Sequence, residues 1–443
     1  MKYLYITLAS FVFYSFWDFR FLFLFVIIGL TDYSLALAIQ RYSHWGKGLV
    51  AISIVNSLAW LILFKYSDFV AIHLDMILKL FDVNLRLRSR VPEVMLIGPV
   101  GLSFYSFMSI SYLIETFRGR MVPTRNPLHY LAYLSFFPHL MCGPIIRARD
   151  LLVQLEEKRT SSEGQRWEAA ILISHGYFKK VVLADNFAPF VNAAFVNPQF
   201  NESGIYWWVV MIFFAAQIYC DFSGYSDIAR GLFKGMGYDI PLNFNHPYIS
   251  LGLREFWQRW HISLSTWFRD YVYIPIGGSK TPAIKALRNL WITFLLSGIW
   301  HGAAWHFVAW GGLHALYLTL ERWTRWPSRL GRLRFGNALC LGVTLLQVIS
   351  AWVFFRAENL SQGMKILLAM FTRFSLDLTI PPFVSALLLL LILRETFIYF
   401  SSKDRFHFAF FDWKPIQELT LALLLTAAVY LRGPGYAFIY FQF

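Results

Sequence analysis

Charged side chains are scarce in this sequence, and their scarcity excludes a soluble globular protein. Asp, Glu, Lys and Arg together make up 15% of its 443 residues, whereas 57% of the residues are hydrophobic and 19% are aromatic. A typical soluble domain devotes about a quarter of its residues to charge. Because too few polar side chains are present to cover a surface in water, we expect much of the surface to face lipid.

Patterns that bind metals or nucleotides are also missing. The sequence contains no GxxxxGK[ST], GxSxG or HExxH motif. Three histidines lie close together, His301, His306 and His314, but spacings of five and eight place them on different faces of a helix. We therefore expect no metal site. The chain has three widely spaced cysteines without a CxxC pair, which we expect to pack in the interior: Cys142, Cys220 and Cys340.

Long runs without any charged residue are what the sequence has in abundance. These runs are continuously apolar, and a membrane helix needs about 20 such residues. Since the bilayer core admits only helices or closed barrels, and barrels require alternating polarity, we predict an all-α, polytopic integral membrane protein. The runs cover residues 48–64, 94–114, 126–146, 289–320 and 335–355.

The apolar segments predict about 11 to 13 membrane helices and re-entrant segments around a central cavity. No internal repeat or folded polar insertion interrupts them, so we predict a single domain over residues 1–443. The first run lacks a small-residue cleavage site and is typical of a signal-anchor helix. The predicted spans lie near residues 3–17, 20–40, 48–65, 94–115, 127–146, 168–184, 187–200, 204–220, 289–320 (two passes), 335–355, 378–398 and 416–431.

The formal charge of +14 does not indicate nucleic-acid binding, because the basic residues flank the apolar runs. This distribution is typical of membrane proteins whose basic side chains contact lipid head groups or mark cytoplasmic loops. We predict that Arg147, Arg149, Lys179 and Lys180 mark cytoplasmic ends of this kind.

Residues 221–288 are polar in comparison with the segments on either side. A charge at membrane depth costs about 2.5–3.5 kcal/mol, so these side chains must face an interior, a water-filled cavity or the interface. We predict that this stretch forms a polar interfacial or active-site region. It opens with DFSGYSD at 221–227, in which Asp221 or Ser223 either caps the next helix or lines the rim of a cavity.

His301 stands inside the uncharged run 289–320, which we predict to be a catalytic segment. As one helix, these 32 residues would measure about 48 Å against a hydrocarbon core of about 30 Å, so the run is expected to break. Gly298 and Gly302 flank the histidine at the expected break. A dry surrounding keeps an imidazole neutral and able to accept a proton, which suits a general base. The alternative is a structural histidine that hydrogen-bonds two helices.

His261 lies in a segment where tryptophan and arginine crowd at helical spacing. Ser265 follows four residues later and would share a helix face with it, which allows a Ser-His nucleophile pair. The alternative is a helix that anchors the chain at the membrane interface.

Several motifs together resemble one family. They are FYSFWD at 13–18, GLSFY at 101–105, FPHLMCGPIIR at 137–147, FKK at 178–180, DFSGYSD at 221–227, WHISLSTWFRDY at 260–271, WHG at 300–302 and FIYFQF at 438–443. Their combination resembles the membrane-bound O-acyltransferase family, in its bacterial alginate O-acetyltransferase branch. The resemblance covers essentially the whole chain.

The resemblance implies an enzyme with His301 as the intramembrane catalytic histidine and His261 as the second active-site histidine. It also implies a ring of helices around a thin cavity, which the acyl donor enters from the cytosol and the acceptor from the opposite face. The donor would be acetyl-CoA as a co-substrate, with no tightly bound cofactor. The candidates for binding this donor are Trp257, Arg259, Arg269 and Asp270.

The same resemblance implies an acetylated cell-surface polysaccharide as acceptor, reached through a periplasmic acetyltransferase partner, and a place in the bacterial inner membrane. A sister branch transfers D-alanine to teichoic acid, but IPIGGS at 274–279 resembles the acetylating branch. A different class of protein stays open as the alternative. It is a polysaccharide or lipid transporter whose histidines relay protons. Relatives usually begin with one further hydrophobic segment, so the chain is expected to start late.

Overall fold

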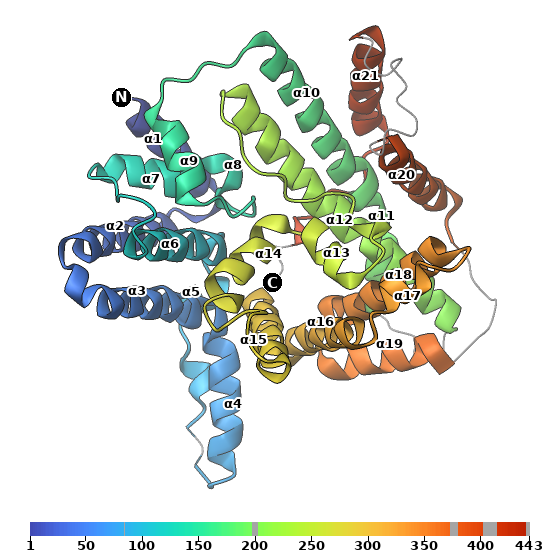
Figure 1. The fold of residues 1–443 in the computed structure, drawn as a ribbon, viewed down its shortest axis with the longest axis horizontal. Helices are drawn as coiled ribbons and strands as arrows, with labels where there is room; N and C mark the ends of the chain where they lie inside the picture. Colours follow the sequence, from blue (N-terminus) through green and yellow to red (C-terminus); the bar gives the residue numbers. More distant parts are fainter. Residues whose placement is uncertain (84, 197–202, 373–379, 402–413, 440–443) are drawn as a thin grey trace. The chain divides into compact units, whose positions relative to one another are not determined.

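The computed structural model describes residues 1–443 except 84, 197–202, 373–379, 402–413 and 440–443 (Figure 1). The described residues form helices and connecting turns without a β-strand, which confirms the all-α prediction. The chain divides into two compact units. Unit 1 comprises Met1–Gln165 and Phe233–Pro241, and unit 2 comprises Arg166–Leu232 and Leu242–Phe443.

Unit 1 is built around α6, whose side chains are buried along almost its whole length. Helices α2 and α3 pack against α6 and against each other, and α1 packs against α7 (Figure 1). The helices are α1 (Lys2–Asp18), α2 (Arg20–Arg41), α3 (Gly46–Leu61), α4 (Ser67–Lys79), α5 (Glu93–Ile97), α6 (Leu102–Phe117), α7 (Pro127–Ser135), α8 (Phe137–Leu140) and α9 (Ala148–Glu156).

Unit 2 carries both candidate histidines. Helix α16 packs against α15, α13, α18 and α19, so these helices form one layer around its apolar core. Its helices are α10 (Glu163–Phe178, from Arg166), α11 (Asp185–Val196), α12 (Gly204–Gly235, as far as Leu232), α13 (Leu253–Arg259), α14 (Ile262–Phe268), α15 (Ala283–His301), α16 (Trp305–Thr324), α17 (Trp326–Leu330), α18 (Gly336–Arg356), α19 (Leu360–Thr372), α20 (Pro382–Ser401) and α21 (Lys414–Tyr430).

Four helical stretches in the described part of the chain are long and apolar enough to cross a membrane. They are Arg20–Arg41, Ser43–Lys79, Gly204–Gly235 and Gly336–Arg356. The total of about 11 to 13 membrane segments stays a prediction. The predicted spans 187–200 and 378–398 reach outside the described residues, at 197–200 and at 378–379.

The predicted end of the span at residue 220 is wrong, because α12 continues to Gly235. Asp221 therefore lies inside a helix and caps none. Its carboxylate instead binds Lys180 Nζ at 2.8 Å and accepts the backbone N–H of Ile439 at 2.6 Å. Helix α12 can continue through the motif at 221–227 because lysines distant in sequence pair with the carboxylates of that motif.

Lys179 and Lys180, which we predicted to mark a cytoplasmic end, do not face lipid, and the side of the membrane on which they lie stays a prediction. Both lysines are 8% exposed and lie in a π-helical turn (Lys179–Ala184) that joins α10 to α11. Lys179 pairs with Asp227 at 2.7 Å, and Lys180 pairs with both Asp185 and Asp221 at 2.8 Å. Such pairing is what allows charge to be buried among apolar helices.

Helices α15 and α16 approach each other through two glycines. A Cβ atom at Gly298 would lie 2.3 Å from the carbonyl oxygen of Phe307, and one at Gly311 would lie 2.3 Å from that of Phe294. Small residues permit this close backbone contact between membrane helices. The contact fixes the end of α15, where His301 is placed.

Gly311→Ala is therefore expected to destabilise the protein by about 1–3 kcal/mol, the usual effect of overpacking a filled interface. The matched control is Gly312→Ala, because a Cβ at Gly312 meets only a leucine side chain at 3.9 Å. Thermal unfolding of the two variants in the same detergent measures the effect. A midpoint for Gly311→Ala equal to that of Gly312→Ala would contradict the close contact.

Candidate active site

His301 is the last residue of α15, where the uncharged run breaks. Gly302 is extended, and α16 begins at Trp305, so the predicted break is confirmed, whereas the two membrane passes stay a prediction. Gly302 lies at the break, whereas Gly298 lies inside α15 and serves the contact with α16. The break turns a single over-long segment into two helices that meet at the histidine.

Aromatic rings surround the imidazole of His301, which is 5% exposed. The ring of Trp310 lies 4.9 Å away and nearly perpendicular, at 86°, and the ring of Phe355 lies 5.1 Å away. Trp300 contributes a third ring at 4.8 Å. These rings leave little of the imidazole exposed to solvent.

His261 precedes α14 rather than lying within it. Its backbone is left-handed, with φ of 42°, and its side chain is 1% exposed. The predicted pairing with Ser265 is wrong, because the Ser265 hydroxyl donates to the carbonyl of Trp260 at 3.1 Å. Since His261 lies outside the helix, the i,i+4 rule does not apply to it.

The side-chain amide that contacts His261 belongs to Asn243, which lies in the predicted polar region 221–288 but was not among the predicted site residues. Asn243 Oδ1 lies 3.2 Å from His261 Nδ1, and the Ser263 hydroxyl lies 3.4 Å from the same nitrogen. The ring of Phe222 packs edge-on against the imidazole at 4.6 Å. Asn243 and His261 are 18 positions apart, and the residues between them include a turn and α13, so no local pattern predicts this contact.

A cavity of about 910 Å³ lies within unit 2, between α13, α14, α15 and the end of α16. Leu290, Phe294 and Ser297 line it from α15. These positions follow one helix face, and His301 is one turn further along that face. Ile262, the neighbour of His261, also lines the cavity. Both histidines are therefore adjacent to residues of the cavity wall.

An aromatic contact connects the cavity wall to His301. Trp257 lines the cavity and packs against Trp310 at 5.8 Å, and Trp310 packs against His301. Of the predicted donor-binding candidates, Trp257 and Arg269 line this cavity. Two of the four predicted donor-binding residues therefore lie in the wall of the same cavity.

The other two candidates are used in ion pairs. Arg259 pairs with Glu255 at 2.8 Å, and Asp270 pairs with Arg269 at 2.7 Å. Neither Arg259 nor Asp270 is among the residues that line the cavity.

Three arginines that our sequence analysis missed line the cavity: Arg254, Arg322 and Arg325. Among the described residues, neither Arg322 nor Arg325 forms an ion pair with an acidic side chain. The neighbouring Glu321 accepts the backbone N–H groups of Leu253 and Arg254, at 2.6 and 3.3 Å. Glu321 also lines the cavity, but the arginines outnumber it, so the cavity wall carries net positive charge and is suited to an anion.

The comparisons with known proteins show the family of the chain. Residues 6–361 match the family model of MBOAT, the membrane-bound O-acyltransferase family. The chain belongs to this family. It is 39% identical over 376 residues to a protein of Azotobacter vinelandii named probable alginate O-acetylase AlgI, covering 82% of this chain and 71% of that protein.

Two further relatives bear on the type of acyl transfer. The chain is 33% identical over 395 residues to the peptidoglycan O-acetyltransferase of Helicobacter pylori, covering 83% of this chain and 73% of that protein. It is 30% identical over 270 residues to the teichoic acid D-alanyltransferase of Bacillus subtilis, covering 57% and 67%. This membrane-bound O-acyltransferase is thus an enzyme whose matches to acetyltransferases are more extensive than its match to the D-alanyl transferase.

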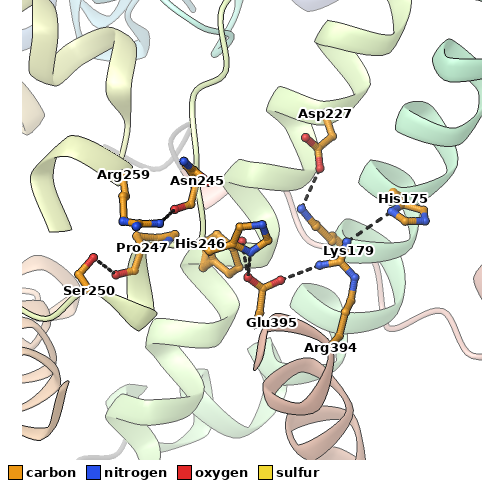
Figure 2. A network of polar contacts seen from close by, with 11 residues as sticks. His175, Lys179, Asp227, Asn245, His246, Pro247, Ser250, Arg259, Arg394 and Glu395 are labelled. Atoms are coloured by element: carbon orange, nitrogen blue, oxygen red, sulfur yellow. Dashed lines mark hydrogen bonds and ion pairs between the residues drawn. The ribbon is translucent and has the colours of Figure 1, made fainter. Parts of the chain in front are cut away.

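The O-acyltransferase also carries a charged network on α20, shown in Figure 2. Glu395 accepts from His246 Nδ1 at 2.5 Å and from the Tyr219 hydroxyl at 3.1 Å. Arg394 pairs with Glu395 at 2.6 Å and lies 3.4 Å from His175 Nδ1. The network anchors an otherwise apolar helix to the segment that leads from Asn243 to His246.

Metal coordination finds no support in the described part of this O-acyltransferase, where no group of three His, Cys, Asp or Glu side chains is arranged to hold an ion. His306 Nδ1 contacts the carbonyl of Phe354 at 2.8 Å, and His314 packs against Trp257 and Trp310. His306 is thus used in a contact with the backbone, whereas His314 shares the ring of Trp310 with His301.

Proposed function

We propose that the enzyme moves an acetyl group from cytosolic acetyl-CoA across the bacterial inner membrane toward hydroxyl groups of an extracytoplasmic polysaccharide. The observation that carries this proposal is the position of His301 at a helix break, one helical turn beyond Ser297 in the wall of a cavity that is lined by arginines. The cavity offers a place for an anionic donor, and the histidine offers a base within reach of its wall.

The arginines suit the phosphates of CoA. Arg254, Arg322 and Arg325 line the cavity together with Arg269. A guanidinium binds phosphate through paired hydrogen bonds, and a hydrogen bond to a charged group contributes about 1.5–3 kcal/mol. The apolar lining from Leu290 and Phe294 is suited to the extended pantetheine arm and the acetyl thioester.

The chemical step uses His301 as general base. Its imidazole takes the proton from the acceptor hydroxyl, whose oxygen forms a bond with the thioester carbonyl carbon. The carbon–sulfur bond then breaks, and the leaving thiolate takes the proton from the imidazolium. His261 either orients the donor or polarises the thioester carbonyl.

The acceptor is proposed as an alginate-like or other cell-surface glycan, reached through a periplasmic acetyltransferase partner. Support comes from relatives named alginate O-acetylase and peptidoglycan O-acetyltransferase. D-alanyl transfer is the second candidate, because a teichoic acid D-alanyltransferase is also related. Competition between acetyl-CoA and a D-alanyl-charged carrier protein would separate the two donors.

Removal of two cavity arginines tests the donor site. In a double Arg322→Gln and Arg325→Gln variant, we expect the KM for acetyl-CoA to rise at least about 100-fold, since two charge-assisted contacts to phosphate of about 1.5–3 kcal/mol each are lost. Release of CoA from labelled acetyl-CoA by purified protein measures this. Arg329→Gln is the matched control, because Arg329 is exposed and does not line the cavity.

Two outcomes would contradict the proposal. An unchanged KM in the double variant would exclude this cavity as the donor site. An absence of both CoA release and protein labelling in the wild type, with polysaccharide or lipid movement instead, would favour a transporter.

A further inference from the structure

Asn243 is wholly buried and makes four contacts through its side-chain amide. Its Oδ1 atom lies 3.2 Å from the backbone nitrogen of Ser263, 2.8 Å from the Ser263 hydroxyl and 3.2 Å from His261 Nδ1. Its Nδ2 atom donates to the Ser226 hydroxyl at 3.2 Å. One amide therefore connects α12, the start of α14 and the second histidine.

These contacts fix which way the amide points. A backbone N–H group can only donate, so the atom that faces the nitrogen of Ser263 must be the carbonyl oxygen of Asn243. The same oxygen faces His261 Nδ1. Because an amide oxygen can only accept, a hydrogen bond between these two atoms requires the hydrogen to be on Nδ1.

The segment that holds Asn243 is fixed on both sides. The carbonyl oxygen of Asn243 accepts the N–H of Ile262 at 2.8 Å, and the N–H of Asn245 donates to the carbonyl of Arg259 at 2.9 Å. One residue further, His246 is held by Glu395 from α20 (Figure 2). The amide is thus held in one position relative to the imidazole and has little freedom to turn away.

We propose that Asn243 is a positioning residue that holds neutral His261 with its proton on Nδ1, so that Nε2 acts as a hydrogen-bond acceptor. The proposal rests on the proposed function and deepens it. A neutral imidazole whose proton is on Nδ1 has no hydrogen on Nε2 with which to polarise a carbonyl. His261 therefore orients the acyl donor or acceptor by accepting a hydrogen bond from one of its N–H or O–H groups.

Two substitutions separate the oxygen acceptor from the bulk of the side chain. Asn243→Leu keeps the approximate size but removes the acceptor, and we expect kcat/KM for acetyl-CoA to fall about 10–100-fold, as for other residues that orient a functional histidine. Asn243→Asp keeps an oxygen in place, and we expect activity within tenfold of the wild type. The control is Asn245→Leu, because Asn245 is exposed and its hydrogen bonds use the backbone.

A double-mutant cycle tests whether Asn243 acts through His261. In a His261→Ala background, Asn243→Leu is expected to cause no further loss of CoA release. A further tenfold loss in that background would show that Asn243 acts elsewhere and would overturn the proposal.

Nitrogen NMR of the protein labelled with ¹⁵N-histidine tests the proton position without any assay of activity. The His261 resonances are assigned by their absence in His261→Gln. We expect a protonated Nδ1 and an unprotonated Nε2 in the wild type, and a loss of this preference in Asn243→Leu but not in Asn245→Leu. A neutral imidazole with its proton on Nε2 in the wild type would overturn the proposal. That result would stand even if acetyl-CoA proved not to be the donor, so the two proposals fail separately.

Discussion

His301→Ala is expected to lower polysaccharide acetylation by at least about 10²–10⁴-fold, which is the usual contribution of a general base. The imidazole ends α15 beside the cavity wall, and aromatic rings enclose it. Alanine at this position removes the proton acceptor while leaving the Gly298 and Gly311 contact between α15 and α16 intact. The variant should therefore accumulate in the membrane at the wild-type level.

The measurement is ester-bound acetyl on the polymer from cells that express matched amounts of each variant. His301→Gln is expected to be equally inactive, because an amide fills similar space but does not act as a base. His44→Ala serves as the control, since His44 is exposed. Near-normal acetylation by His301→Ala would remove the basis of the catalytic assignment.

His261→Ala is expected to reduce donor turnover about 10–100-fold and to leave measurable activity. The reason is that His261 accepts a hydrogen bond in a neutral form and does not take the proton of the acceptor hydroxyl. The imidazole of His261 is held by Asn243 and packs against Phe222. Removing the imidazole therefore disturbs the orientation of the bound substrate at the start of α14.

The two histidines are distinguished by the same CoA-release assay on expression-matched protein. We expect residual turnover in His261→Ala and none in His301→Ala. Because residues that act together are non-additive, the double variant should match His301→Ala alone. Equal and complete loss in both single variants would leave the division of roles without support.

Local patterns in the sequence predicted the parts of the site that depend on the length of an uncharged run and on the polarity of its residues. The run 289–320 exceeds one membrane crossing, so a break was predictable, and the break places His301 at a helix end. Trp257 and Arg269, two of the four donor-binding candidates named with the family resemblance, both line the cavity.

Contacts between distant segments were not predictable. Asp221 lies inside α12 because Lys180 and the backbone of Ile439 neutralise it. Asn243 contacts His261 only because residues between them fold back through α13. No helical or alternating period encodes these pairs, which arise from tertiary packing.

Acetyl transfer across the membrane by way of His301 is tested most directly in sealed membrane vesicles of known orientation that contain the native acetylation machinery. Labelled acetyl-CoA is supplied on the cytoplasmic face, with the polysaccharide acceptor on the opposite face. We predict labelled O-acetyl ester on the acceptor with the wild-type protein and none with His301→Ala. Equal labelling by His301→Ala, or labelling by the wild type only when donor and acceptor share one face, would contradict the account.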